Sequence, residues 1–143
     1  MYLVQPKQMS VYDYFPPYHG ELETAKRWVR LAAASDWDAF EQSYCTQFAR
    51  GGTVAIPARV ALGSLVIQAA YRLSDRETVL LVQESPYLQY FLGCPTFSSQ
   101  VPFSERTLRR FRRRVPARTV RAAVRLLRSF EKEAACPAAR GTE

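Results

Sequence analysis

The chain has 143 residues, 48% of them hydrophobic, and a formal net charge of +7. This length fits one domain with a core of its own. The first ten residues contain no apolar run, and no stretch approaches the roughly 18 apolar residues of a membrane span, so we expect a cytoplasmic protein without membrane partner or signal peptide. The three cysteines (45, 94 and 136) are far apart and His19 is the only histidine, so neither a zinc site nor another cofactor is expected.

The positive charge is gathered in one segment. Residues 101–130 hold ten of the twenty basic residues and only one of the thirteen acidic residues, Glu105, so this segment carries +9 and the rest of the chain −2. A charge that serves solubility is spread with both signs mixed, whereas a localised basic surface favours a polyanionic partner. Nucleic acid is therefore the first candidate partner.

The first fifty residues predict an arm and two helices. Residues 1–20 mix aromatics with prolines and predict an extended arm, which either packs on the core or serves as an interaction segment. Residues 21–34 are good helix formers. Ser35 then caps a second helix, which Gly51 and Gly52 end. Its apolar residues recur at helical spacing, namely Trp37, Phe40, Tyr44 and Phe48.

The middle of the chain predicts three further helical segments. Pro57 begins an almost continuously apolar helix that ends near residue 73, and we expect it to be the central core element. Ser74 and Glu77 form a capping-box pattern, in which each side chain accepts from the other residue's backbone N–H, so another helix starts at Asp75. It runs to residue 84, where Ser85 and Pro86 interrupt it before a short turn over 87–92. Residues 94–102 predict a loop, and no strand pattern is present, which indicates an all-α fold.

The arginine-rich stretch 104–115 predicts a two-faced helix, capped by Ser104 and ended before Pro116. At 100° per residue, three apolar residues fall within roughly 60° of one another, and four arginines cluster within about 100° on the opposite side. The apolar set is Leu108, Phe111 and Val115, and the basic set is Arg106, Arg109, Arg110 and Arg113. Together with the preceding capped helix, this layout is typical of a helix-turn-helix, in a tri-helical variant because about twenty residues separate the two helices.

Arginine suits DNA recognition, because its permanently charged fork holds phosphate or the O6/N7 edge of guanine with two hydrogen bonds. Groove geometry favours the start of the helix for base contacts, hence Arg106, Arg109 and Arg110, with Arg113 and Arg114 on phosphates. The alternative is that this basic face is only solvated and binds no partner. The full set of predicted DNA contacts is Arg106, Arg109, Arg110, Arg112, Arg113, Arg114, Arg118, Arg121, Arg125 and Arg128.

Residues 117–135 predict a last, basic amphipathic helix, followed by a disordered tail at 136–143. Its arginines lie beside an apolar stripe of Val120, Val124, Leu127 and Phe130. The stripe can fold onto the chain's own core, pair with a second copy, or dock a following domain. A membrane surface is a further alternative for such a helix, but the neighbouring arginine helix matches DNA better.

Several short fragments follow one another along the chain, namely RWV at 27–29, DW at 36–37, IPARVALG at 56–63, LSDRET at 73–78, PYLQYFLG at 86–93, PFS at 102–104 and FRRR at 111–114. With these fragments in this order, the chain resembles the N-terminal region of bacterial insertion-sequence transposases of the IS-five-like group. The resemblance implies that residues 21–116 form a helical domain that recognises the terminal inverted repeats of a mobile element. It also implies a downstream RNase-H-like domain, in which two aspartates and a glutamate hold divalent metal.

We find no such catalytic set in these residues. Asp13, Asp75 and Glu105 could be drawn as a triad, but the last two fit first-turn positions of helices. We therefore expect no catalytic or metal-binding residues and no enzymatic activity of this chain alone, as in a truncated or frame-interrupted copy or the first of two reading frames. The alternative function is an interaction module that pairs with an intact transposase and modulates it; a metal-dependent nuclease is a third class.

Overall fold

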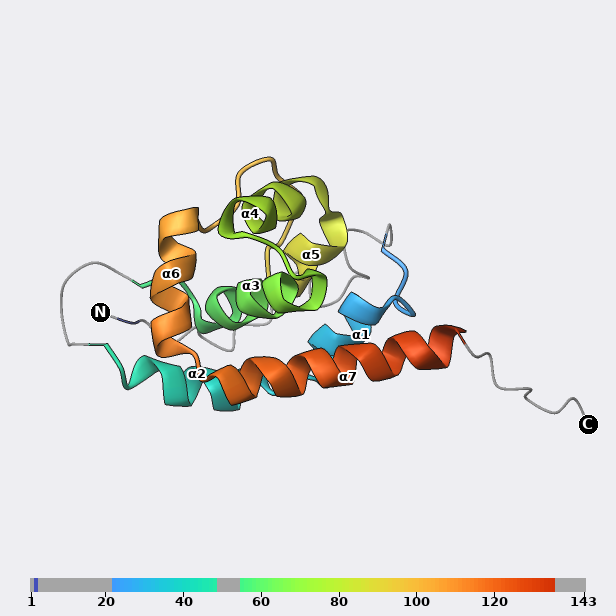
Figure 1. The fold of residues 1–143 in the computed structure, drawn as a ribbon, viewed down its shortest axis with the longest axis horizontal. Helices are drawn as coiled ribbons and strands as arrows, with labels where there is room; N and C mark the ends of the chain where they lie inside the picture. The colour runs from blue at the N-terminus through green and yellow to red at the C-terminus, as the bar shows by residue number, and fades with distance from the viewer. Residues whose placement is uncertain (1, 3–21, 49–54, 136–143) are drawn as a thin grey trace, which may run out of the picture.

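A computed structural model describes residues 2, 22–48 and 55–135, and within these ranges it contains seven α-helices and no strand (Figure 1). The helices are α1 (Arg27–Ala34), α2 (Trp37–Cys45), α3 (Ala58–Tyr71), α4 (Asp75–Glu84), α5 (Pro86–Phe91), α6 (Glu105–Arg114) and α7 (Ala117–Ala135). The predicted all-α fold is confirmed. The expected arm at 1–20, apart from Tyr2, the glycine pair at 51–52 and the tail at 136–143 lie outside the described residues.

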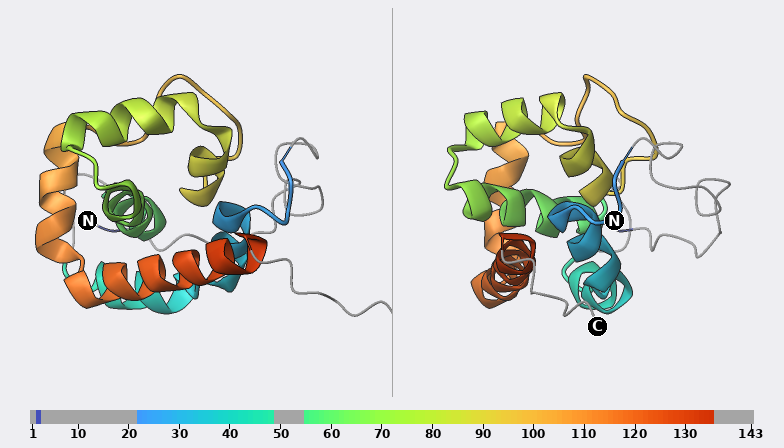
Figure 2. Two further views of the ribbon diagram at one scale, coloured as in Figure 1. Left: turned by 45° about the vertical axis from the view of Figure 1, so that its right-hand side comes forward. Right: turned by 90° about the vertical axis from the view of Figure 1, so that its right-hand side faces the viewer.

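Helix α3 forms the centre of the fold, as its apolar sequence predicts. Every residue from Val60 to Ile67 is buried, because an apolar helix without a polar face has to be covered on all sides. Seen end-on in Figure 2, α3 lies inside a ring made by α4, α5, α1, α7 and α6, while α2 packs on it as well. Arg72 ends α3 in the left-handed conformation, with φ 53°.

Two boundaries near the N-terminus differ from the sequence prediction. Helix α1 begins at Arg27 instead of residue 21. The cap of α2 is Asp36, whose carboxylate accepts a hydrogen bond from the Ala39 backbone N–H at 3.0 Å. Ser35, the predicted cap, instead ends α1, and its hydroxyl donates to the Leu31 carbonyl. Helix α2 then ends at Cys45, before the glycine pair.

Helices α4 and α5 begin at serine caps. Ser74 accepts from the Glu77 backbone N–H at 3.1 Å as predicted, but the Glu77 carboxylate does not return the bond, so only half of the expected capping box forms. Ser85 caps α5 through the Leu88 N–H. The buried Gln89 amide then fixes the loop that leads to α6, since it both donates to the Ser98 carbonyl and accepts from the Ser98 N–H.

Helix α7 packs against α3 and α1. Its stripe residues Val124 and Leu127 are buried, and the Arg30 guanidinium of α1 lies 4.1 Å from the centre of the Phe130 ring. Two ion pairs, Arg27 with Glu131 and Arg30 with Glu133, hold the end of α7 on α1. Of the three partners considered for the stripe, the chain's own core is the one observed.

Candidate nucleic-acid interface

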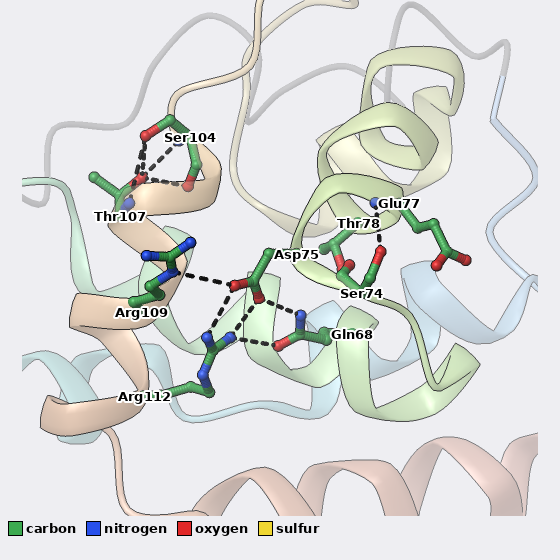
Figure 3. Close-up of polar contacts among 9 residues, drawn as sticks. All are labelled: Gln68, Ser74, Asp75, Glu77, Thr78, Ser104, Thr107, Arg109 and Arg112. Carbon is green, nitrogen blue, oxygen red and sulfur yellow. Dashed lines mark hydrogen bonds and ion pairs between the residues drawn. The ribbon is translucent and has the colours of Figure 1, made fainter.

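The start and end of α6 are set by its own sequence. Ser104 and Thr107 form a reciprocal capping box, in which the Ser104 hydroxyl accepts from the Thr107 N–H and the Thr107 hydroxyl accepts from the Ser104 N–H (Figure 3). Such a box satisfies two backbone donors that have no partner inside the helix. Val115, which precedes a proline, ends the helix in an extended conformation. Both predicted limits are confirmed.

The inner face of α6 is built into the core. Leu108 is fully buried, and Phe111 and Val115 are buried beside it. They place α6 against α3 and the beginning of α4. The apolar seam predicted from the helical wheel is thus the surface that docks α6 on the protein, which leaves the opposite side of the helix to solvent.

The outer face of α6 presents four exposed guanidinium groups, those of Arg106, Arg109, Arg110 and Arg113. Arg109 has 69% of its side chain exposed, and its Nε lies 3.8 Å from the Asp75 carboxylate. Within the described part of the chain, no carboxylate pairs with the other three. Like charges this close on one helix repel one another, which favours the binding of an anion that screens them.

Arg112 is exposed as well, but it is placed differently from its neighbours because it is paired with Asp75. It makes two hydrogen bonds with Asp75, of 2.5 and 2.9 Å, and one with the Gln68 amide oxygen at 3.1 Å. Gln68 in turn donates to Asp75 at 2.8 Å (Figure 3). These contacts join α3, α4 and α6 through side chains. The hydrogen bonds from Arg112 are the main cause that lowers the pKa of Asp75 from 3.8 to about 2.

The sequence carried a signal for the different placement of Arg112. At 100° per residue it lies only about 40° from Leu108 around the helix, so it borders the apolar face and not the exposed one. An arginine in that position extends along the neighbouring elements, and here it reaches the first residue of α4. From the sequence, Asp75 was explained only by its position in the first turn of a helix, and its contact with Arg112 was not predicted.

Arg114, at the end of α6, is half-buried and packs against α2. Its guanidinium lies 4.3 Å from the centre of the Phe48 ring. Burial raises the pKa of the Tyr44 hydroxyl, and the adjacent Arg114 opposes that rise. The Gln47 amide donates to the Arg114 carbonyl at 2.9 Å. Arg114 therefore tethers α6 to α2, which is a different role from the phosphate contact predicted for it.

The four arginines of α7, Arg118, Arg121, Arg125 and Arg128, are all exposed, as predicted. Their helix starts where α6 ends and runs away from it at a large angle (Figure 1). A hollow of about 310 Å³ lies in the corner between α3, α6 and α7, and both Arg112 and Arg121 line it. The two basic helices are thus consecutive along the chain, and one arginine of each lines this corner. The DNA contacts of all ten arginines stay predictions.

Other kinds of site find little support in the residues that the structure describes. Among them no three His, Cys, Asp or Glu side chains gather in a group that could hold a metal ion. No disulfide joins Cys45 and Cys94. No helix in these ranges has the length and apolar character to cross a membrane. The basic surface of α6 and α7 is the feature that favours a binding partner, namely an anionic one.

Comparison with known proteins decides the family. Residues 11–114 match the family model described as Transposase domain (DUF772). The chain belongs to this transposase-domain family. The match ends at the last residue of α6, so the arginine helix lies inside the family region and α7 follows it. The transposase resemblance seen in the sequence is thereby confirmed in its broad form.

One curated relative matches part of the chain. The "Uncharacterized protein ORF8 in nfe locus" of Rhizobium meliloti is 30% identical over 87 residues. The aligned part is 61% of this chain and 42% of that protein, so the chain spans less than half of the relative's length. No solved structure matches the chain significantly.

Proposed function

We propose that this transposase domain binds double-stranded DNA, as the region that recognises the terminal inverted repeats of an insertion sequence of the IS-five-like group. The observation that carries the proposal is the division of α6 into two faces. Leu108 and Phe111 are buried in the core, while four guanidinium groups on the opposite side face solvent. A helix held on the protein by one face and covered with arginine on the other fits the major groove of DNA.

The two basic helices have separate parts in this proposal. Helix α6 acts as the recognition helix of a tri-helical, helix-turn-helix-like unit with α4 and α5. It packs against α4, and α5 lies between these two helices along the chain. The exposed arginine row of α7 meets phosphates beside the groove, since phosphate contacts fix the register of a protein on the duplex. Arg112 and Arg114 hold α6 in place, and base contacts fall to Arg106, Arg109 and Arg110.

The domain binds without cutting DNA in this proposal. Hydrolysis of a phosphodiester by metal ions needs carboxylates that converge on the ions. Of the three carboxylates considered and set aside as a triad, Asp75 is engaged by Arg112, Glu105 lies in the first turn of α6, and Asp13 is outside the described residues. Cleavage and strand transfer would then belong to a catalytic part with which this domain works.

The salt dependence of binding to a generic DNA duplex tests the proposal. If roughly six phosphates are engaged, the logarithm of the binding constant should fall against the logarithm of salt with a slope near −5. Replacing Arg110 by alanine should weaken binding and make the slope less steep by up to about 1. Fluorescence anisotropy across a salt series measures both, and the duplex should stay intact when magnesium is present.

A matched control separates position from total charge. Lys26 is exposed at the start of α1, with its ammonium 3.6 Å from Glu23, so Lys26→Ala removes one positive charge outside the proposed surface. The slope should then stay as in the unmodified protein. Absent or salt-insensitive binding would reject the proposal, and an equal effect of both variants would show that only net charge matters.

The alternative of an interaction module that modulates an intact transposase rested on the apolar stripe of α7. That stripe packs on α1 and α3, with Val124 and Leu127 buried. The centre of the stripe is therefore covered by the chain's own core, while Val120 and Phe130 are half-buried. DNA binding is therefore the function that the described surface supports best.

A further inference from the structure

We propose that Arg109 recognises a guanine in the DNA, and that Asp75 is the residue that positions it. This inference rests on the proposed function and deepens it, because it names the base that the domain reads and the side chain that reads it. Asp75 itself would not touch the DNA.

The geometry of Arg109 divides its guanidinium into a held side and a free side. The Nε lies 3.8 Å from the Asp75 carboxylate. In Figure 3 the contact drawn from Arg109 starts at Nε, and none is drawn from its two terminal nitrogens. Guanine is recognised by two parallel hydrogen bonds from an arginine to its O6 and N7 atoms. A guanidinium that is held at Nε keeps its two terminal nitrogens available for this pair of bonds.

This arrangement distinguishes Arg109 from the other exposed arginines of α6. Ordering a long, flexible side chain upon binding costs conformational entropy. A nearby carboxylate limits the orientations of Arg109 before DNA arrives and so reduces that cost. Arg106, Arg110 and Arg113 have no such carboxylate within the described residues. Without such a restraint, each of them loses more conformational freedom than Arg109 when it reads a base.

Asp75 is a firm support because it is held itself. Arg112 binds it with two hydrogen bonds and Gln68 with a third, and only 20% of its side chain is exposed. Its carboxylate is ionised at neutral pH, and its lowered pKa extends the ionised range to more acidic pH. The 3.8 Å separation from Arg109 exceeds a hydrogen bond, so the contact restrains Arg109 without locking it. A binding side chain supported by a second layer of fixed contacts is placed more accurately than an unsupported one.

The test starts with selection of the full chain on a pool of duplexes with a random core. One position of the selected sites should be guanine, and replacing that guanine by 7-deazaguanine should weaken binding, because it removes the N7 acceptor. Adenine at that position should weaken it about 5- to 150-fold. Arg109→Lys keeps the charge but lacks the planar fork, so it should abolish the preference and leave the salt slope unchanged.

Two further variants make the result specific. Arg110→Lys, the matched change one residue along, should keep the guanine preference. Asp75→Asn should reduce the preference, while binding to a generic duplex stays equal or becomes tighter because a negative charge is removed. A purely structural role of Asp75 would instead weaken binding to every sequence alike.

The outcomes separate this inference from the proposed function. If the unmodified protein binds DNA with the expected salt slope but selects no guanine, or if Arg109→Lys retains the preference, the inference is overturned and DNA binding stands. If it does not bind DNA at all, both fall.

Discussion

Asp75 is the side chain on which the most contacts of the basic surface converge. It begins α4, accepts hydrogen bonds from Gln68 of α3 and Arg112 of α6, and lies near Arg109. A carboxylate at the start of a helix is also favoured by the helix dipole. One residue thus stabilises the start of its own helix and fixes the position of another.

The pH dependence of stability should reveal the Asp75–Arg112 pair. The folded-state pKa of Asp75, about 2, lies below its ordinary value of 3.8, so the pair contributes stability above pH 3.8 and loses it as the pH falls through 2. Asp75→Asn should therefore be less stable than the unmodified protein near neutral pH, by about 1 kcal/mol after allowance for solvent screening. Urea unfolding of both proteins across this pH range measures the difference.

The comparison of the two proteins cancels the acid titration of all other carboxylates. The difference in unfolding free energy should shrink as the pH falls below 3.8 and nearly vanish at pH 2. A difference that stays constant over this range would show that the charge of Asp75 contributes nothing and that only its shape matters.

At the residue scale, the sequence predicted which arginines of the basic surface are exposed but not which residues the others contact. The exposure of Arg106, Arg109, Arg110 and Arg113 follows from their angles around one helix, which local geometry fixes. The partner of Arg114 could not be predicted, because Phe48 lies 66 positions earlier in the chain and comes close only through the packing of α2 on the fold. Contacts between distant segments are not encoded in a local pattern.

Among the elements, α6 shows how much a short helix depends on its inner face. Its ten residues include six arginines, and an isolated helix of this length is marginal in water. Burial of Leu108 and Phe111 against α3 and α4 therefore supplies much of its stability. Local signals set where such helices begin and end, and the limits of α6 were predicted well because Ser104 and Pro116 lack nearby competitors.

The boundary of α2 was predicted wrongly because two capping residues are adjacent. Ser35 and Asp36 can each cap a helix. The Ser35 hydroxyl is used by the last turn of α1, which leaves Asp36 to cap α2. The choice depends on whether the last turn of the preceding helix uses the Ser35 hydroxyl, which a capping pattern alone does not specify. An early local error of this kind does not affect the core helix, whose apolar pattern is continuous.

Replacing one leucine in each basic helix should show that a buried leucine contributes more to the free energy of unfolding than an exposed one. Leu108→Ala should lower the free energy of unfolding by about 2 to 5 kcal/mol, because it leaves a cavity under α6. Leu126→Ala on α7, where the side chain is 38% exposed, should cost less than about 1 kcal/mol. Urea unfolding followed by circular dichroism measures both. Equal costs would mean that Leu108 is not buried against the core.

On the scale of the whole molecule, the covered position of α3 makes the fold depend on one helix. Helices α2, α4, α6 and α7 all pack on it, and α1 and α5 complete the ring (Figure 2). The sequence predicted the central role of α3, because only this segment is apolar on every side. It did not predict the order of helices around it, since an amphipathic stripe specifies that a helix packs but not on which neighbour.

Hydrogen exchange should reflect this arrangement. The backbone amides of residues 61–67 lie in the fully buried part of α3 and should exchange only when the whole domain unfolds. The exposed last turn of α7, at residues 132–135, should exchange by local opening and hence much faster. Mass spectrometry of peptic fragments measures both segments. Similar rates in the two would contradict a single cooperative core around α3.

The separation of the two sides of α6 has a consequence for how such a domain changes over generations. The side chains that dock the helix and those that face outward are different residues, so an outward arginine can be exchanged without disturbing the interior. Most surface substitutions of this kind alter stability by no more than about 0.5 kcal/mol. If the proposed DNA binding holds, a lineage that carries this scaffold can therefore drift toward new target sites while its architecture is conserved.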